Sequence, residues 1–223
     1  MVAAPPRPVQ PLPTVLLTGF DPFGGEGVNP SWLAVQALQG RRIAGHRLVT
    51  AQLATVFGTA LAQLQALLRQ HRPALVICVG QAGGRAALSL ERVAINLDDA
   101  RIADNAGAQP IDTAVVPGGP AAYFTTLPVK AMRAALERKG LAAEVSQTAG
   151  TFVCNHVFYG LMHLLATQRA HRKTRGGFVH VPWLPEQGAP SMALDDVVSG
   201  LRVAVRVALT TPQDIRVAAG QIS

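Results

Sequence analysis

The chain has 223 residues, of which 49% are hydrophobic and 15% are charged, and its formal net charge is +7. This length fits one domain, and the apolar content excludes a disordered chain, because enough apolar surface is available to offset the entropy lost on folding. Two cysteines exclude a disulfide-rich scaffold and a four-cysteine zinc site. The cations are scattered and only 5% of residues are aromatic, so we expect no nucleic-acid partner.

Residues 1–13 are rich in proline and are expected to form an extended tail in front of a domain at 14–223. They contain no apolar region typical of a secretory signal, and no apolar run in the chain is long enough to span a bilayer. We therefore expect a cytoplasmic protein with reduced thiols and no membrane partner.

Apolar periodicity and turn residues then predict an alternation of strands and helices along the chain. Strands are expected at 14–19, 47–53, 74–80, 88–96, 143–147 and 177–181. Helices are expected at 30–38, 56–70, 128–139, 155–168 and 194–209, and residues 97–120 form a long polar stretch that is functional or pairs irregularly. This order predicts an α/β fold, namely a single-domain α/β/α sandwich with a central, mixed and largely parallel twisted sheet, similar to phosphorylases and hydrolases.

Loops that follow strands are the places to look for chemistry, because ligands of open α/β sheets bind outside the carboxyl ends of the strands. Four such segments are expected to meet at one rim of the sheet. They are residues 20–29, residues 81–85, residues 148–154 and the segment around His180.

Cys154 is the candidate nucleophile, since it follows a strand and a turn of small residues at the start of a predicted helix. Backbone N–H groups and the helix dipole favour a thiolate at such a position. Cys78 lies in the middle of a strand between Ile77 and Val79, and we expect it to be an inert core residue.

A thiol nucleophile needs a general base, which is most often histidine. His180 is the best candidate, because its strand is apolar and ends two residues later at Pro182. His156 and His163 share the predicted helix with Cys154, but two or three possible ligands on one helix are weak evidence for a zinc site. We therefore expect no metal and no cofactor. The remaining histidines, His46, His71 and His171, are expected at the surface.

A carboxylate usually orients the imidazole of such a pair. Four acidic residues lie in or near polar loops, and their spacing does not choose among them. They are Glu91, Asp98, Asp99 and Asp104.

Four segments resemble the type I pyroglutamyl peptidases, a family of cytoplasmic cysteine peptidases that remove an N-terminal pyroglutamyl residue from peptides. They are GFDPFGGEGVNPSW (19–32), GQAGGRAALSLERVAINLDDARIADNAGAQP (80–110), AGTFVCNHVFYGLMH (149–163) and GFVHVPWLPEQ (177–187). Leu90 and Ala103 stand where many relatives have proline, which affects only local loop rigidity.

The resemblance implies catalytic roles for Glu91, Cys154 and His180, and so selects Glu91 among the four carboxylates. It also implies a pocket for the pyroglutamyl ring, with Arg101 either near the reacting groups or in a structural ion pair with Asp98 or Asp99. The implied pocket residues are Phe20, Phe23, Gln81 and Val153. Acyl transfer through a thioester, peptide substrates with N-terminal pyroglutamate, and a homotetramer or homodimer follow from the same resemblance.

Two other classes remain as alternatives. The fold also suits a nucleoside phosphorylase-like enzyme whose glycine turns hold phosphate, although only fold analogy supports it. The positive charge also suits a basic nucleic-acid-binding module, whose binding would be strongly salt-dependent.

Overall fold

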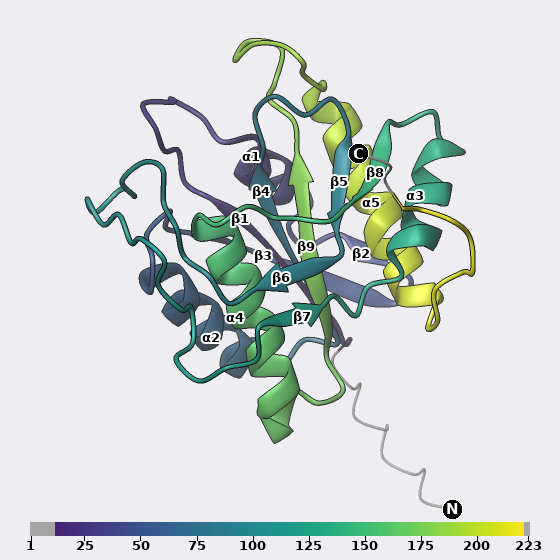
Figure 1. Ribbon diagram of the computed structural model, residues 1–223. Helices are drawn as coiled ribbons and strands as arrows, with labels where there is room; N and C mark the ends of the chain where they lie inside the picture. The colour runs from purple at the N-terminus through teal and green to yellow at the C-terminus, as the bar shows by residue number, and fades with distance from the viewer. Residues whose placement is uncertain (1–11, 221–223) are drawn as a thin grey trace, which may run out of the picture.

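The computed structural model describes residues 12–220. The predicted tail therefore lies outside the described residues except for Leu12 and Pro13, and residues 221–223 lie outside them as well. Within residues 12–220, seven strands form one sheet in the order β2-β3-β1-β4-β9-β5-β8 (Figure 1). Their bounds are β1 (Thr14–Phe20), β2 (Arg42–Ile43), β3 (His46–Leu53), β4 (Leu75–Gln81), β5 (Leu88–Glu91), β8 (Ala143–Ser146) and β9 (Arg175–Val181).

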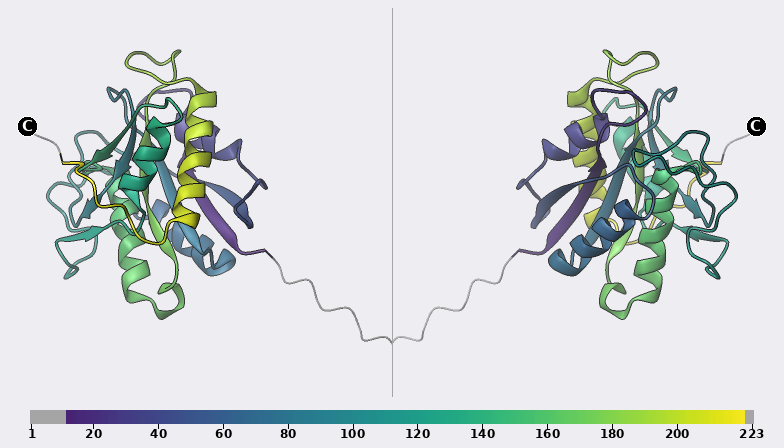
Figure 2. Two further views of the ribbon diagram at one scale, coloured as in Figure 1. Left: turned by 90° about the vertical axis from the view of Figure 1, so that its right-hand side faces the viewer. Right: turned by 90° about the vertical axis from the view of Figure 1, so that its left-hand side faces the viewer.

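Helices cover both faces of this sheet, as the two side views in Figure 2 show. One face packs against α1 (Pro30–Gln36), α3 (Val129–Glu137) and α5 (Leu194–Thr210), and the other against α2 (Thr59–His71) and α4 (Val153–Thr167). All seven residues of β4 are buried, as expected for a strand with helices on both sides. The predicted α/β sandwich is confirmed. No helix among the described residues has the length and apolar character needed to cross a membrane.

The strand directions make the sheet mixed, as predicted. Strands β3, β1, β4 and β9 are parallel neighbours, whereas β5 runs antiparallel to β9 and parallel to β8. The last strand in the sequence, β9, therefore joins the parallel part of the sheet to the reversed pair β5 and β8. The loop after β8 consequently leaves from the opposite end of the sheet to the loops after β1, β4 and β9.

The strand expected at 88–96 and the start of the helix expected at 155 differ from the sequence prediction, whereas the irregular stretch at 97–120 does not. The strand expected at 88–96 is interrupted at Arg92, and β6 (Val93–Ile95) leaves the main sheet to pair with β7 (Ala122–Phe124) beside α4. Residues 97–120 stay irregular, with one isolated bridge between Asp98 and Thr113. Helix α4 begins at Val153, two residues earlier than predicted, so Cys154 lies in its first turn. Strands β2 and β7 are too short to produce a periodic signal.

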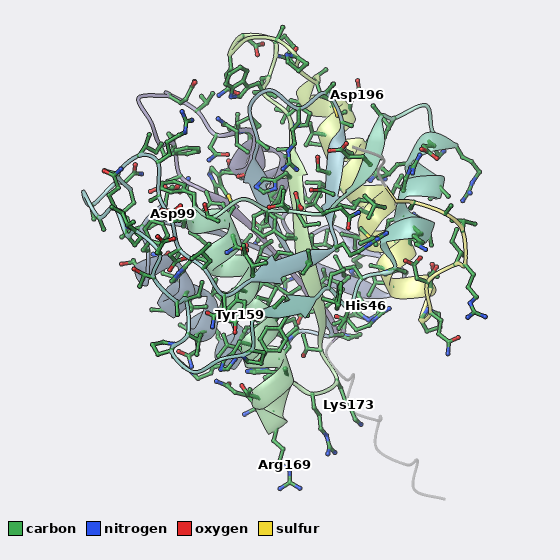
Figure 3. The ribbon with its side chains drawn as sticks, viewed as in Figure 1. His46, Asp99, Tyr159, Arg169, Lys173 and Asp196 are labelled. Carbon is green, nitrogen blue, oxygen red and sulfur yellow. The ribbon has the colours of Figure 1, made fainter. Side chains whose placement is uncertain are left out.

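The basic segment after α4 corrects one prediction. Figure 3 shows Arg169 and Lys173 projecting into solvent, and both are exposed. His171 is buried, with 3% of its surface exposed, because it ends a short 3-10 turn, η1 (Arg169–His171), that closes the connection between α4 and β9. The prediction that His171 is solvated was wrong.

Candidate active site

Two of the predicted site residues come from neighbouring strands and share one face of the sheet. Ser89 of β5 lies opposite His180 of β9, and Glu91 lies opposite Phe178, so His180 and Glu91 both point toward the face that α4 covers. The two side chains meet, with His180 Nδ1 2.8 Å from Glu91 Oε1. Both are buried, His180 with 4% and Glu91 with 0% of the residue exposed.

Cys154 reaches the same place from the first turn of α4. Gly80 of β4 is the in-register neighbour of His180, and a Cβ added to Gly80 would lie 2.7 Å from Cys154 Sγ. The sulfur therefore sits directly over Gly80, on the same face as His180. Since Glu91 occupies Nδ1 of the imidazole, Nε2 is the ring nitrogen left for the thiol. The structure thus brings together the cysteine, histidine and glutamate that the sequence singled out.

The environment of Cys154 acts against the thiolate that its place at a helix start favours. Burial raises the pKa of the Cys154 thiol to about 12, the Glu91 carboxylate adds to this, and the Arg85 guanidinium opposes it. Burial outweighs the helix start, which we expected to favour a thiolate. A thiol with this pKa is uncharged at neutral pH, so it becomes a nucleophile only when a neighbouring base accepts its proton.

Arg85 is the site residue that the sequence analysis missed. Its Nη1 atom lies 2.7 Å from Glu91 Oε1, the same oxygen that His180 contacts, and its Nη2 atom donates to the Thr148 carbonyl at 3.1 Å. The available signal was a cation directly after the glycine turn that follows the most apolar strand. The role of Arg85 was not recognised, because its pairing with Glu91 depends on the antiparallel direction of β5, which the apolar periodicity of the sequence does not reveal.

Buried polar contacts fix the start of α4 relative to the loops. The Asn155 side chain accepts from the Ile95 amide at 3.1 Å and donates to the Ile95 and Leu97 carbonyls, each at 2.9 Å. His156 holds Asp98 through Nδ1 at 2.8 Å and accepts from the Gly58 amide through Nε2 at 3.1 Å. With both ring nitrogens engaged, His156 has no lone pair available for a metal.

The other three carboxylates have different surroundings from Glu91. Asp98 pairs with His156, and Asp104 accepts backbone N–H groups of a loop. Asp99 is tied to the segment before α4, where its backbone amide donates to the Thr151 carbonyl at 3.0 Å. Among the four candidates, Glu91 is the one that contacts His180. No group of three metal-binding side chains is found within residues 12–220.

A hollow of about 290 Å³ lies beside the start of α4. It is lined by Phe23, Asp99, Arg101, Ile102, Thr151 and Phe152. The rings of Phe23 and Phe152 are 6.0 Å apart, which joins the loop after β1 to the segment before α4. Arg101 is exposed at this hollow and, within the described part of the chain, makes no ion pair with Asp98 or Asp99.

The other three predicted pocket residues, Phe20, Gln81 and Val153, are not among the residues that line this hollow. Phe20 is buried at the end of β1 with its ring 6.3 Å from that of Phe178, and Val153 is fully buried in the first turn of α4. Gln81 ends β4, and its Oε1 atom accepts from Gln187 Nε2 at 3.3 Å. Gln187 also donates to Glu26 at 3.2 Å, so it links the loops after β1, β4 and β9.

The four predicted segments therefore meet, although one of them does so for another reason than we expected. Residues 148–154 follow β8, whose carboxyl end points away from the rim, and they return across the sheet to reach it. Contacts between Thr148 and Arg85 and between Phe152 and Phe23 mark where they arrive.

The fold is an α/β sandwich, and its site places a cysteine at a helix start beside a histidine that contacts a buried glutamate. This arrangement is typical of the cysteine hydrolases as a class. A family model described as pyroglutamyl peptidase matches residues 13–211, and the chain belongs to this family. The alternatives of a phosphorylase-like enzyme and a nucleic-acid-binding module are not favoured.

Known relatives agree with this assignment. The chain is 62% identical to pyrrolidone-carboxylate peptidase 1 of Ralstonia nicotianae, over 95% of this chain and 100% of that protein. It is 52% identical to a pyrrolidone-carboxylate peptidase of Bacillus cytotoxicus, over 91% and 95% of the two chains. The structure matches that of pyroglutamyl peptidase I from Bacillus amyloliquefaciens with a TM-score of 0.90 and 49% identity, covering 93% of this chain and 100% of that one.

Gly80 allows one prediction from packing alone. We expect Gly80→Ala to reduce kcat/KM on a pyroglutamyl amide by about 100-fold, because the new methyl group would lie 2.7 Å from Cys154 Sγ and 2.8 Å from Phe178 Cζ, and a displacement of the sulfur by about 1 Å costs this much. The rate of Cys154 alkylation by iodoacetamide should fall with it. Gly119→Ala also crowds a buried side chain, Tyr159, but away from the sulfur, and it serves as the control. Wild-type kinetics in Gly80→Ala would contradict the placement of Sγ.

Proposed function

We propose that this enzyme removes the N-terminal pyroglutamyl residue of peptides with Cys154 as nucleophile, His180 as general base and acid, and Glu91 as the group that orients His180. The observation that carries the proposal is the contact of the buried Glu91 carboxylate with His180 Nδ1, on the sheet face where Cys154 Sγ sits over Gly80. This contact supports an imidazole with its proton on Nδ1 and an unprotonated Nε2 toward the thiol.

The raised pKa of Cys154 determines how the first step begins. Because the thiol is uncharged at neutral pH, Cys154 transfers its proton to His180 as the sulfur attacks the carbonyl carbon of the pyroglutamyl group. The imidazolium that forms is stabilised by the Glu91 carboxylate 2.8 Å from Nδ1.

Collapse of the tetrahedral intermediate breaks the peptide bond. His180 gives its proton to the leaving amine, and a thioester remains on Cys154. The oxyanion needs N–H donors, and the Cys154 amide is one, because the first turn of a helix supplies no acceptor for its own N–H groups. His180 then takes a proton from water, which hydrolyses the thioester and releases pyroglutamate.

The hollow beside α4 has the character that the pyroglutamyl ring requires. A neutral lactam without a free amine fits between aromatic and aliphatic walls, and Phe23, Phe152 and Ile102 provide them. Val153 places its backbone next to the nucleophile, and Phe20 supports the site from below through Phe178. Gln81 supplies amide groups for the lactam edge, and Arg101 lies close enough to the hollow to act on the substrate.

The test is hydrolysis of a fluorogenic pyroglutamyl amide compared with its prolyl analogue, under reducing conditions. We expect cleavage of the pyroglutamyl compound and a kcat/KM for the prolyl compound lower by about 10⁴-fold, because proline leaves the polar groups of the site unpaired. Comparable cleavage of both compounds would refute the proposed ring pocket, and cleavage of neither would refute the activity.

The family resemblance also supports two statements about the protein's setting. We infer that it acts in the cytoplasm on peptide substrates and that copies of it associate as a homodimer or homotetramer. Light scattering of the purified protein tests the assembly, and a monomer at micromolar concentration would refute it.

A further inference from the structure

Glu91 carries a negative charge that is removed from water on all sides. Its side chain has no exposed surface, and within residues 12–220 its Oε2 atom has no hydrogen-bond partner. Oε1 therefore bears both contacts of the carboxylate, to His180 at 2.8 Å and to Arg85 at 2.7 Å. A buried carboxylate without a cation is costly and tends to take up a proton instead.

Arg85 is the permanent cation at this carboxylate. His180 is charged only in part of the reaction cycle, whereas a guanidinium is charged at every working pH. Within the described residues, no other lysine or arginine forms an ion pair with Glu91. Arg85 is therefore the counter-charge that Glu91 keeps whatever the charge of His180.

The guanidinium is itself held in place. Nη2 donates to the Thr148 carbonyl at 3.1 Å, and Ser146 Oγ, which lies 3.4 Å from Nη1, donates to the same carbonyl at 3.0 Å. Ser146 is the last residue of β8, and Thr148 belongs to the turn between β8 and the start of α4. Arg85 thus connects the glycine turn after β4, the buried carboxylate and the segment that leads to Cys154.

We propose that Arg85 is a positioning residue, which keeps Glu91 ionised and aimed at His180 while it fixes the turn that precedes Cys154. This inference rests on the proposed roles of Glu91, His180 and Cys154. The side-chain contacts of Arg85 within the described residues are with Glu91, Ser146 and Thr148, so we assign it an action on the reacting groups through Glu91.

The consequence concerns the proton on the imidazole. If Glu91 is protonated, it no longer accepts the proton of Nδ1, and the imidazole loses the tautomer that leaves Nε2 free to act as a base. Loss of Arg85 therefore affects the rate of the chemical step and its pH dependence more than it affects substrate binding.

The experiment compares Arg85→Met and Arg85→Lys with a matched control, Arg133→Met, which removes an exposed arginine that is also 2.7 Å from a glutamate. For Arg85→Met we expect kcat to fall about 10- to 100-fold with KM changed less than about twofold, and the acid limb of kcat/KM to move to higher pH. Arg85→Lys keeps the positive charge but loses the planar guanidinium that contacts Glu91 and Thr148 at the same time. We therefore expect kcat to fall less and the acid limb to stay at its wild-type position. Arg133→Met should match the wild type.

Two results would overturn the proposal. One is an acid limb in Arg85→Met that coincides with that of the wild type, and the other is a loss that appears in KM alone. Thermal unfolding of each variant identifies a folding defect, and if Arg85→Met does not fold, Arg85→Gln takes its place and must show the same shift. Failure of the proposed function would look different, because the wild type would then not cleave the pyroglutamyl amide or Cys154→Ser would still cleave it.

Discussion

Cys154→Ser is expected to lose at least about a thousandfold in kcat on a pyroglutamyl amide while keeping the wild-type fold. The serine hydroxyl fits where the thiol sits over Gly80, but it is a much weaker nucleophile with the same imidazole as its base. Steady-state hydrolysis measures the loss, and circular dichroism verifies the fold.

Cys78→Ser is the matched control for this substitution. Cys78 lies on β4, has no exposed surface, and has a pKa raised to about 12 by burial, as expected for an inert core thiol. The variant should retain kcat/KM within about threefold and lose about 1 to 3 kcal/mol of unfolding free energy, because the buried hydroxyl costs more to desolvate than a thiol and Thr18 is its polar neighbour. Loss of activity in Cys78→Ser with retention in Cys154→Ser would exchange the roles of the two cysteines.

Glu91→Gln is expected to lower kcat by about 10² to 10⁴-fold with a small change in KM. The amide has nearly the same shape, but it carries no charge to stabilise the imidazolium, and its NH₂ group can face His180 Nδ1 and impose the wrong tautomer. The variant should also unfold at a lower temperature, since Arg85 loses its buried counter-charge. Kinetics over a pH series and thermal unfolding measure the two effects.

Glu137→Gln provides the comparison for Glu91→Gln. Glu137 is also 2.7 Å from an arginine, but about half of its side chain is exposed on α3. We expect wild-type kinetics and a change in unfolding free energy below about 1 kcal/mol, as is usual for a surface pair. Equal kinetic losses in the two variants would mean that removal of any ion pair slows the enzyme, and the special role of Glu91 would be wrong.

The periodicity of the sequence was sufficient to predict the layers of the fold. Long apolar segments such as β4 and α5 produce a strong signal. Their predicted bounds differ from the observed ones by no more than one residue at either end. The reversed direction of β5 and β8 could not be predicted, because strand direction is set by pairing partners far away in the chain. The same limitation explains why the strand expected at 88–96 was not divided at Arg92.

The candidate site was predictable to the extent that each residue carried a local signal. Cys154 and His180 stand out beside a helix start and at a strand end, whereas Glu91 was one carboxylate among four until the resemblance selected it. Arg85 carried only a weak signal, its place directly after a glycine turn, because an arginine at such a place is usually solvated and its partner Glu91 lies on a strand whose direction the sequence does not reveal. For Cys154 the helix start is visible in the sequence, whereas the burial that raises the pKa of its thiol is not.

The position of β9 has a consequence for the biosynthesis of the enzyme. This strand comes last in the sequence, yet it lies between β4 and β5 and provides their connection within the sheet. A growing chain that lacks β9 has no link between the strand that carries Gly80 and the strand that carries Glu91, and it also lacks His180. We therefore expect that peptidase activity appears only after β9 has left the ribosome, and that a chain truncated before β9 is inactive.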